Sequence, residues 1–261
     1  MSPNPTKGAE VTETRELAGR SALITGGASG IGAACARAFA ARGAEVTIAD
    51  IDDVGAKRLA RELGGKAWAV DLLDVEALEN LRLEVDILVN NAGVQRIDPI
   101  QDFPPEQFRR LLALMVEVPF LLIRAALPHM YARGFGRIIN ISSVHGLRAS
   151  AYKAAYVTAK HGLEGLSKVT ALEGGPHGVT SNCVNPGYVR TPLVDKQIAD
   201  QARAHGIPEQ EVLDKILLTE SAIKRLVEPE EVAALSVWLA SPSAGMVSGA
   251  SYTMDGGWSA R

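Results

Sequence analysis

Short runs of apolar residues, many of them β-branched, alternate with longer stretches of helical periodicity along most of this 261-residue chain. This alternation is typical of repeated βα units, in which helices connect the parallel strands of one sheet. The apolar runs are nearly continuous instead of alternating with polar residues, as expected for strands whose sheet is covered on both faces. We therefore predict an α/β fold with a single doubly wound parallel sheet of about seven strands and helices on both faces.

The chain shows no repeat and no interior linker, so one domain is predicted over residues 17–261. Residues 1–16 are polar and aperiodic and are expected to form a mobile N-terminal tail. Residues 191–228 have helical periodicity without a strand and begin just after a predicted strand end. Because ligands bind at that edge of open α/β sheets, we predict a small helical substrate lid there. The predicted strands are 21–25, 45–49, 66–70, 87–90, 137–141, 180–184 and 250–254, and the short stretch 71–86 leaves room for only a truncated helix.

Composition excludes several function classes. The net charge is −3 with 22% charged residues, so no electrostatic argument favours nucleic acid or an anionic membrane. The most apolar stretch, 111–127, is interrupted by Glu117, Pro119 and Arg124, and no run of membrane-spanning length is expected. The N-terminus lacks the apolar core of a signal peptide. Cys35 and Cys183 have no metal or redox spacing, so no metal site is predicted, and buried thiols in a reducing cytoplasm are expected.

A glycine-rich turn, Gly26-x-x-x-Gly30-x-Gly32, follows the first predicted strand and opens the helix expected at 33–41. Glycines permit a tight turn and a close approach of the backbone to a pyrophosphate. The helix N-terminus then offers N–H donors and a favourable dipole to that anion. Taken alone, the motif is also compatible with an ordinary turn. Asn90-Asn91-Ala92-Gly93, at the end of the fourth predicted strand, would likewise allow a ligand close to the backbone.

Asp50 ends the second predicted strand, where a carboxylate can accept hydrogen bonds from the adenosine ribose hydroxyls and repel a 2′-phosphate. The residues that follow it, Ile51, Asp52 and Asp53, include no Arg or Lys. This favours NAD over NADP as the cofactor. Asp71, after the third strand, is compatible with contact to the adenine edge or with capping a helix.

Tyr156 and Lys160 are separated by four residues and so share one face of a predicted helix. A phenol is a poor acid or base at neutral pH, and a nearby ammonium favours its phenolate form. The pair therefore predicts a proton donor or acceptor that works near neutral pH. The spacing alone is weak, because it occurs by chance on many helices. Ser143 and the glycine-rich turn make it specific, and together they indicate hydride transfer with a nicotinamide.

In sequence order, TGGASGIG, NNAG, Ser143, YVTAK and the segment 186–191 (PGYVRT) resemble the short-chain dehydrogenase/reductase superfamily over residues 17–261. Within that superfamily, FGRIINISSVHG, YVTAKHGLEGLSKVTALE, VRTPLVDKQIA and DGGWSAR are similar to D-3-hydroxybutyrate dehydrogenases. The resemblance implies a Rossmann-type sheet, NAD as the cofactor and a homotetramer. It implies subunit contacts through the last strand and through helices at about 104–133 and 154–173.

The resemblance also implies roles for individual residues. Tyr156 would be the acid/base, Ser143 would hydrogen-bond the reacting oxygen, and Lys160 would lower the pKa of Tyr156 and hold the nicotinamide ribose. The implied cofactor-binding residues are Gly26, Ser29, Gly30, Ile31, Gly32, Asp50, Ile51, Asp71, Leu72, Asn91, Ala92, Gly93, Tyr156, Lys160, Pro186, Gly187, Val189 and Thr191. The implied substrate-binding residues are Gln95, Ser143, His145, Lys153, Tyr156, Tyr188, Gln197 and Trp258, of which Gln95, His145, Lys153 and Gln197 would bind a carboxylate.

One position departs from the superfamily pattern. Met115 stands where many members carry an Asn that helps to hold a water beside the active-site Lys, and methionine cannot hydrogen-bond in that way. We expect altered proton handling in an active enzyme. The predicted reaction is the NAD-dependent interconversion of (R)-3-hydroxybutyrate and acetoacetate. The alternatives are a reductase of the same fold acting on a 3-oxoacyl thioester, a polyol or a cyclic alcohol, and a non-catalytic NAD-binding sensor.

Overall fold

The computed structural model describes residues 15–260 and contains one seven-stranded sheet, in the order β3-β2-β1-β4-β5-β6-β7 with every pairing parallel. The chain order reverses between β1 and β4, so the carboxyl ends of these two strands flank a switch point where open sheets bind ligands. The strands are β1 Ser21–Thr25, β2 Glu45–Asp50, β3 Lys66–Ala69, β4 Ile87–Asn90, β5 Gly136–Ile141, β6 Val179–Pro186 and β7 Ser251–Met254. The predicted fold class is confirmed, and the predicted strands differ only at their ends.

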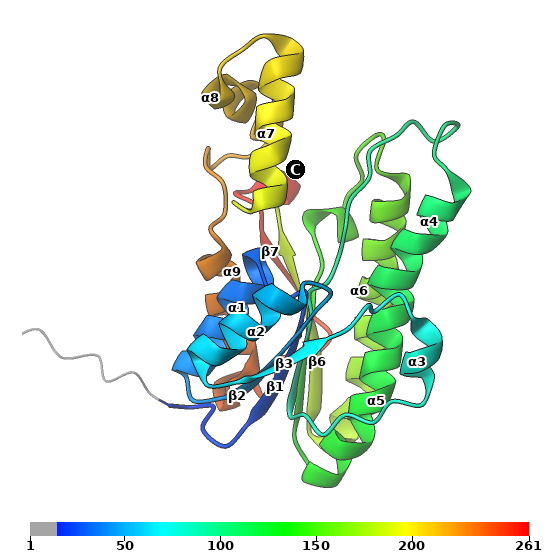
Figure 1. Cartoon of the computed structure of the whole chain (residues 1–261), viewed down its shortest axis with the longest axis vertical. Coiled ribbons are helices and arrows are strands. Elements are labelled where there is room, and N and C mark those ends of the chain that lie inside the picture. The colour runs from blue at the N-terminus through cyan, green and yellow to red at the C-terminus, as the bar shows by residue number, and fades with distance from the viewer. Residues whose placement is uncertain (1–14, 261) are drawn as a thin grey trace, which may run out of the picture.

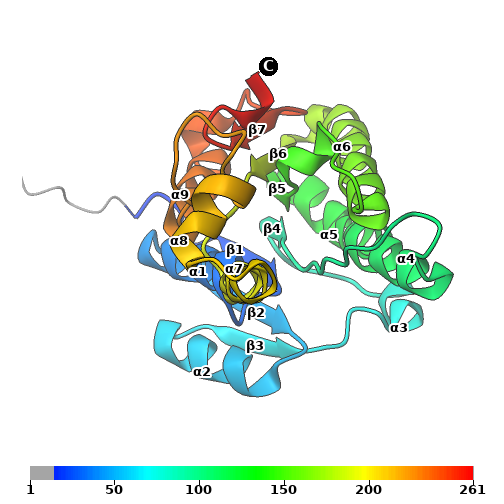
Figure 2. The same cartoon turned by 90° about the horizontal axis from the view of Figure 1, so that it is seen from above.

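Helices cover both faces of the sheet, as Figures 1 and 2 show. One layer contains α1 Gly30–Ala41, α2 Asp53–Leu63 and α9 Pro229–Ala240, and the other contains α3 Val75–Glu79, α4 Pro105–Leu112, α5 Val118–Arg133 and α6 Ala154–Gly174. Each layer has its own apolar core: Phe39 and Ile48 are fully buried on the first face, and Leu88 and Leu122 on the second. Helix α3 has five residues, in agreement with the short element predicted in this part of the chain.

A continuous helix runs from Pro105 to Arg133, because a π-helical turn, η1 (Ala113–Glu117), joins α4 to α5. By length and composition alone this helix could cross a membrane, although half of its most apolar window is buried inside the fold. Glu117, Pro119 and Arg124 interrupt the apolar run at 111–127 but not the helix, which was expected at about 104–133. Pro119 is the second residue after the π-helical turn η1, and the helix continues through it. Packing against the sheet accounts for the apolar character of the buried half.

The segment between β6 and α9 extends beyond the carboxyl ends of the strands (Figure 1). It contains α7 Pro192–His205, α8 Glu209–Val212 and a π-turn, η4 Leu213–Leu217, and is the helical region predicted for 191–228. Its helices share a small apolar cluster of their own, which includes Ile198 and Val212. A parallel bridge between Val189 and Val227 closes the base of the segment. It thus packs as a separate unit at the ligand-binding edge of the sheet, a suitable place for a lid.

Candidate active site

The glycine-rich turn has the geometry of an anion cradle. Gly26 and Gly30 adopt positive φ angles of 60° and 52°, which other residues rarely tolerate. A Cβ on Gly32 would lie 2.1 Å from the Gly26 carbonyl oxygen, so only glycine fits there. Ser29 precedes α1 without capping it through its side chain, and the first turn of α1 carries no acidic residue. The N–H groups at the start of α1 thus remain available to a phosphate group.

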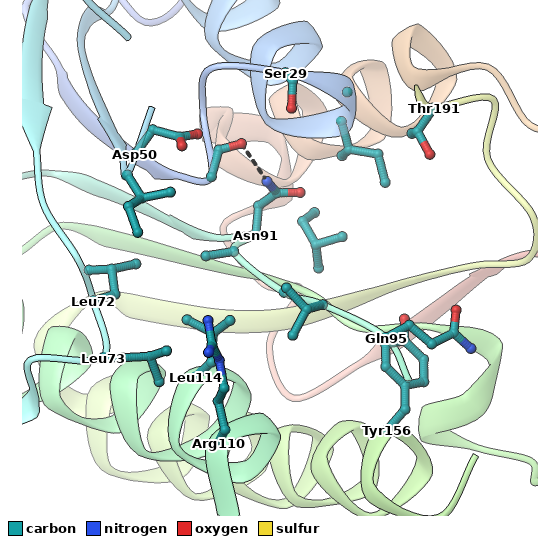
Figure 3. Close-up of a pocket in the computed structure, with 18 of the residues that line it drawn as sticks. Ser29, Asp50, Leu72, Leu73, Asn91, Gln95, Arg110, Leu114, Tyr156 and Thr191 are labelled. Carbon is teal, nitrogen blue, oxygen red and sulfur yellow. Dashed lines mark hydrogen bonds between the residues drawn. The ribbon is translucent and has the colours of Figure 1, made fainter. Parts of the chain in front are cut away.

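Hydrogen bonds connect this turn to the end of β4. The side-chain amide of Asn91 donates to the carbonyls of Thr25 and Gly26 at 2.9 and 3.1 Å, and Figure 3 shows this contact. The Thr25 hydroxyl oxygen in turn accepts from the backbone N–H groups of Asn91 and Ala92, at 3.0 and 3.1 Å. The two strand ends at the switch point therefore hold a fixed geometry.

The Asp50 carboxylate lies at the end of β2 and supports the same turn. Its two oxygens accept the backbone N–H groups of Ala28 and Asp52, each at 2.9 Å. Asp50 also lines the cleft, so it can both hold the turn and face a ribose. Asp52, by contrast, caps α2 by accepting the N–H of Gly55, a local structural role.

A cleft of about 430 Å³ brings most of the predicted cofactor residues together (Figure 3). Its walls contain Gly26, Ser29, Gly30, Ile31, Asp50, Ile51, Asp71, Leu72, Asn91, Ala92, Gly93, Tyr156, Lys160 and Thr191. Gly32 instead packs behind the turn, and Pro186 lies at the end of β6. Gly187 and Val189 line an adjoining pocket that shares Tyr156 and Thr191 with the cleft. The N–H groups of the uncapped helix and the glycine-rich turn can donate to the phosphates of a dinucleotide, and the Asp50 carboxylate can accept from its ribose.

Ser143, Tyr156 and Lys160 meet where the cleft joins the adjoining pocket. Ser143 follows β5, while Tyr156 and Lys160 lie one turn apart on α6. The Lys160 ammonium donates to the Ile141 carbonyl at 2.7 Å and lies 5.6 Å from the centroid of the Tyr156 ring. The Ser143 hydroxyl donates to the Pro186 carbonyl at 3.5 Å and accepts the N–H of His145 at 3.2 Å. The geometry places a proton donor or acceptor beside a hydroxyl.

The pKa of Tyr156 does not follow the expectation from the sequence. Burial raises it, and a hydrogen bond with Ser143 opposes the increase only in part. Burial also lowers the pKa of Lys160, to about 8. Without a cofactor, the expected lowering of the Tyr156 pKa by Lys160 is outweighed by burial, because loss of water disfavours both the phenolate and the ammonium. The ammonium of Lys160 also hydrogen-bonds the Ile141 carbonyl instead of the phenol.

The adjoining pocket has a volume of about 300 Å³ and lies under the lid segment. It contains six of the predicted substrate residues: Gln95, Ser143, His145, Tyr156, Tyr188 and Trp258. Lys153 lies in the wall behind Tyr188 and donates to the Tyr188 hydroxyl at 3.5 Å. Its side chain is 9% exposed, and burial lowers its pKa. Gln197 lies in α7, and its side chain is outside the part of the chain that the structure describes.

His145 is held in one orientation at the floor of this pocket. Its Nε2 hydrogen-bonds the Ser150 hydroxyl at 2.9 Å, and its ring lies 5.7 Å from that of Trp258. Burial, together with the charge of Lys153, lowers its pKa to about 4. A neutral imidazole therefore faces the pocket at neutral pH.

Known proteins of similar sequence show which family this chain belongs to. The profile of a family described as enoyl-(acyl carrier protein) reductase matches residues 26–259. The D-beta-hydroxybutyrate dehydrogenase of Rhizobium meliloti (strain 1021) is 43% identical over 93% of this chain and 99% of its own length. The chain belongs to the short-chain dehydrogenase/reductase family.

Two further family members are similar along nearly the whole chain. The D-beta-hydroxybutyrate dehydrogenase of Cupriavidus necator is 41% identical over 94% of this chain and all of its own length. A candidate NAD(P)-dependent gluconate 5-dehydrogenase of Beutenbergia cavernae, solved with bound NADP, superimposes with a TM-score of 0.83. It is 34% identical and covers 95% of this chain and 99% of its own. The chain is thus an oxidoreductase of a family that uses nicotinamide cofactors.

Met115, the departure from the family pattern, lies in the π-helical turn η1 and is 1% exposed. It packs in an apolar cluster with Phe103, Leu111 and Ala159. A Cβ on Gly93 would lie 3.2 Å from its sulfur, so the Met115 side chain extends toward the cofactor cleft. Met115 thus fills, with an apolar side chain, the space next to the helix that carries Tyr156 and Lys160.

Several residues of the site were missed from the sequence. Arg110 and Leu114, one turn apart on the helix that faces the cleft, line its wall together with Leu73 (Figure 3). Their i, i+4 spacing puts them on one face of the helix, but the spacing alone does not show that this face lines the cleft. Glu220 and Asp255 also line the smaller pocket; Asp255 begins the DGGWSAR segment noted in the sequence, whereas nothing in its local sequence marks Glu220.

Proposed function

We propose that this enzyme interconverts (R)-3-hydroxybutyrate and acetoacetate with NAD as the cofactor. The observation that carries the proposal is Lys153, a largely buried ammonium that donates only a long hydrogen bond, to the Tyr188 hydroxyl of the pocket, among the contacts described for it, and whose pKa is lowered by burial. A small acid could supply the missing negative charge. Its carboxylate would replace the Tyr188 hydroxyl as the acceptor of Lys153, next to His145 and Gln95.

The chain's own residues account for the proton and for orientation. With its carboxylate at Lys153, the acid would present its hydroxyl to Tyr156 and Ser143, both of which line the same 300 Å³ pocket. In its phenolate form Tyr156 would take the hydroxyl proton and become a neutral phenol, and Ser143 would donate a hydrogen bond to the substrate oxygen as its charge changes. Bound NAD would accept the hydride from the carbon that carries this oxygen. Fixing the substrate at both ends contributes several kcal/mol to lowering the barrier, of the order known for oriented reactants.

The choice of NAD rests on Asp50. Its carboxylate is held at the cleft wall by the N–H groups of Ala28 and Asp52, where a 2′-phosphate would be repelled. Arg110 lines the cleft from α4, on a different wall from Asp50 (Figure 3). Its position makes it a contact for the adenine half of the cofactor and not a substitute for a basic residue beside Asp50.

The proposal extends to a homotetrameric assembly and a cytoplasmic location. Large apolar side chains are exposed on α5 and α6, including Phe120 and Leu172. A homotetramer is expected to form through these two helices and the last strand, β7. Its subunit contacts would bury the exposed apolar surface of α5 and α6. The two free buried cysteines suit a reducing cytoplasm.

A substrate panel tests the proposed function. We expect kcat/KM for acetoacetate reduction to exceed the values for acetoacetyl-CoA and for a polyol such as D-threitol by at least about tenfold, about 1.4 kcal/mol. A higher kcat/KM for acetoacetyl-CoA would indicate that the substrate is a longer thioester and not the free acid. Tight NADH binding without turnover of any panel member would indicate a sensor instead of an enzyme.

A further inference from the structure

Glu164 is a carboxylate buried beneath the candidate active site. It lies on α6, one turn after Lys160 and two turns after Tyr156, and is only 4% exposed. Burying a carboxylate is costly unless hydrogen bonds and an opposite charge stabilise it. Neither the proposed cofactor site nor the substrate pocket includes this side chain. Its environment therefore requires a separate explanation.

Both carboxylate oxygens of Glu164 accept hydrogen bonds from other elements. The Asn185 amide on β6 donates to Oε1 at 2.5 Å, and the Ser251 hydroxyl on β7 donates to Oε2 at 2.7 Å. Both partners act as donors, as an ionised carboxylate requires. The space around it is full, because a Cβ on Gly146 would lie 2.8 Å from Oε1. Glu164 is thus a fixed negative charge at the junction of α6, β6 and β7.

This charge is coupled to the reacting groups in two ways. The same Asn185 amide nitrogen that binds Glu164 donates to the backbone carbonyl of Ser143 at 2.9 Å, which fixes the residue whose hydroxyl faces the pocket. Burial lowers the pKa of Lys160, and the charges of Cys183 and then of Glu164, which is one helical turn away, raise it against this effect. One carboxylate therefore supports both sides of the Ser143–Tyr156–Lys160 site.

We propose that Glu164 is a positioning residue for this site: it orients Ser143 through Asn185 and is the buried counter-charge that keeps Lys160 protonated. The proposal rests on the roles proposed above for Ser143 and Lys160. It also bears on Met115, because an apolar residue at that position offers Lys160 no polar contact from η1.

The groups around Lys160 leave Glu164 as the relevant charge. Among the residues that the structure describes, Tyr156 and Glu164 lie one turn before and one turn after Lys160 on α6, and the Ile141 carbonyl of β5 accepts its hydrogen bond. Cys183 on β6 is the remaining titratable neighbour. Burial raises the pKa of its thiol far above neutral, so it carries no charge in the working range.

The test compares Glu164→Gln with the wild type over a pH series, by kcat/KM for (R)-3-hydroxybutyrate and by NADH affinity from fluorescence. The glutamine keeps the size and an acceptor for Asn185 but removes the charge. Lys160 should then lose its proton at a lower pH. The decrease of kcat/KM and of NADH affinity at alkaline pH, here called the alkaline fall, should therefore begin roughly one to two pH units lower. The matched control is Ser251→Ala, which removes a hydrogen bond and keeps the charge, and its alkaline fall should stay in place.

An equal loss at every pH, without movement of the alkaline fall, would make Glu164 merely structural and overturn the proposal. If Glu164→Gln does not fold, Glu164→Asp tests the same point: it keeps the charge but cannot reach Asn185 equally well, so kcat should fall while the alkaline fall stays in place. A shift in that variant would contradict the counter-charge. The NADH measurement needs no substrate, so a wrong substrate assignment would leave this test intact.

Discussion

Replacing Lys153 with methionine removes the cation behind Tyr188 in the wall of the substrate pocket but keeps an unbranched apolar chain of similar length. The ammonium is almost fully buried, and its hydrogen bond to Tyr188 is long, at 3.5 Å, so a substrate carboxylate is the stronger acceptor. A hydrogen bond between charged groups contributes about 1.5–3 kcal/mol. Losing it should lower kcat/KM for (R)-3-hydroxybutyrate by roughly 10- to 150-fold.

The informative comparison uses the methyl ester of the same hydroxy acid, which has no charge to bind. For the ester, Lys153→Met should change kcat/KM by less than about threefold, which corresponds to well under 1 kcal/mol. Lys168→Met is the matched control, because Lys168 is an exposed lysine on the same helix. Equal losses on acid and ester would mean that Lys153 supports the fold of the pocket, and an unchanged rate on the acid would refute the carboxylate clamp.

Three further predictions concern the cofactor, the core and pH. Asp50→Ala should raise the ratio of NADP to NAD use, measured as kcat/KM, by about tenfold or more, because it removes a charge that repels the 2′-phosphate; an unchanged ratio would contradict this role. Met115→Asn should lower the free energy of unfolding by about 1–3 kcal/mol in urea titrations, because it buries an amide in an apolar cluster; an equally stable variant would mean that a polar partner is available there. The pKa of His145 is about 4 in the folded chain against an ordinary 6.5, so stability should fall as pH drops from 6.5 toward 4, and less so in His145→Gln; identical pH profiles of Tm would refute it.

Much of the fold followed from the sequence because its signals are local. The strands were found as apolar runs, and the glycine-rich turn, Asp50 and Asn91 were found because they stand at strand ends. Parallel strands bring their carboxyl ends to one edge, so residues far apart in sequence could be grouped from the sequence. Ser143 was grouped with the pair on α6 through the resemblance to the short-chain dehydrogenase/reductase superfamily.

The missed features depend on long-range geometry. Arg110 lines the cleft because of how α4 packs against the rest of the fold, which the residue spacing within the helix does not show. The direction of the Tyr156 pKa shift depends on how much water the fold excludes. The bonds of Glu164 depend on the register of β6 with β7, which sets Ser251 opposite Cys183. None of these could be obtained from residue spacing.

The measurement that tests the central claim most directly is NADH formation at 340 nm with (R)-3-hydroxybutyrate and NAD⁺, run beside the (S)-enantiomer and beside NADP⁺. Turnover confined to the (R)-acid with NAD⁺ is the predicted result, since the Lys153 clamp, Asp50 and the Ser143–Tyr156 pair must all act as proposed to produce it. Equal rates with both enantiomers, or no turnover in a protein that binds NADH, would contradict the account.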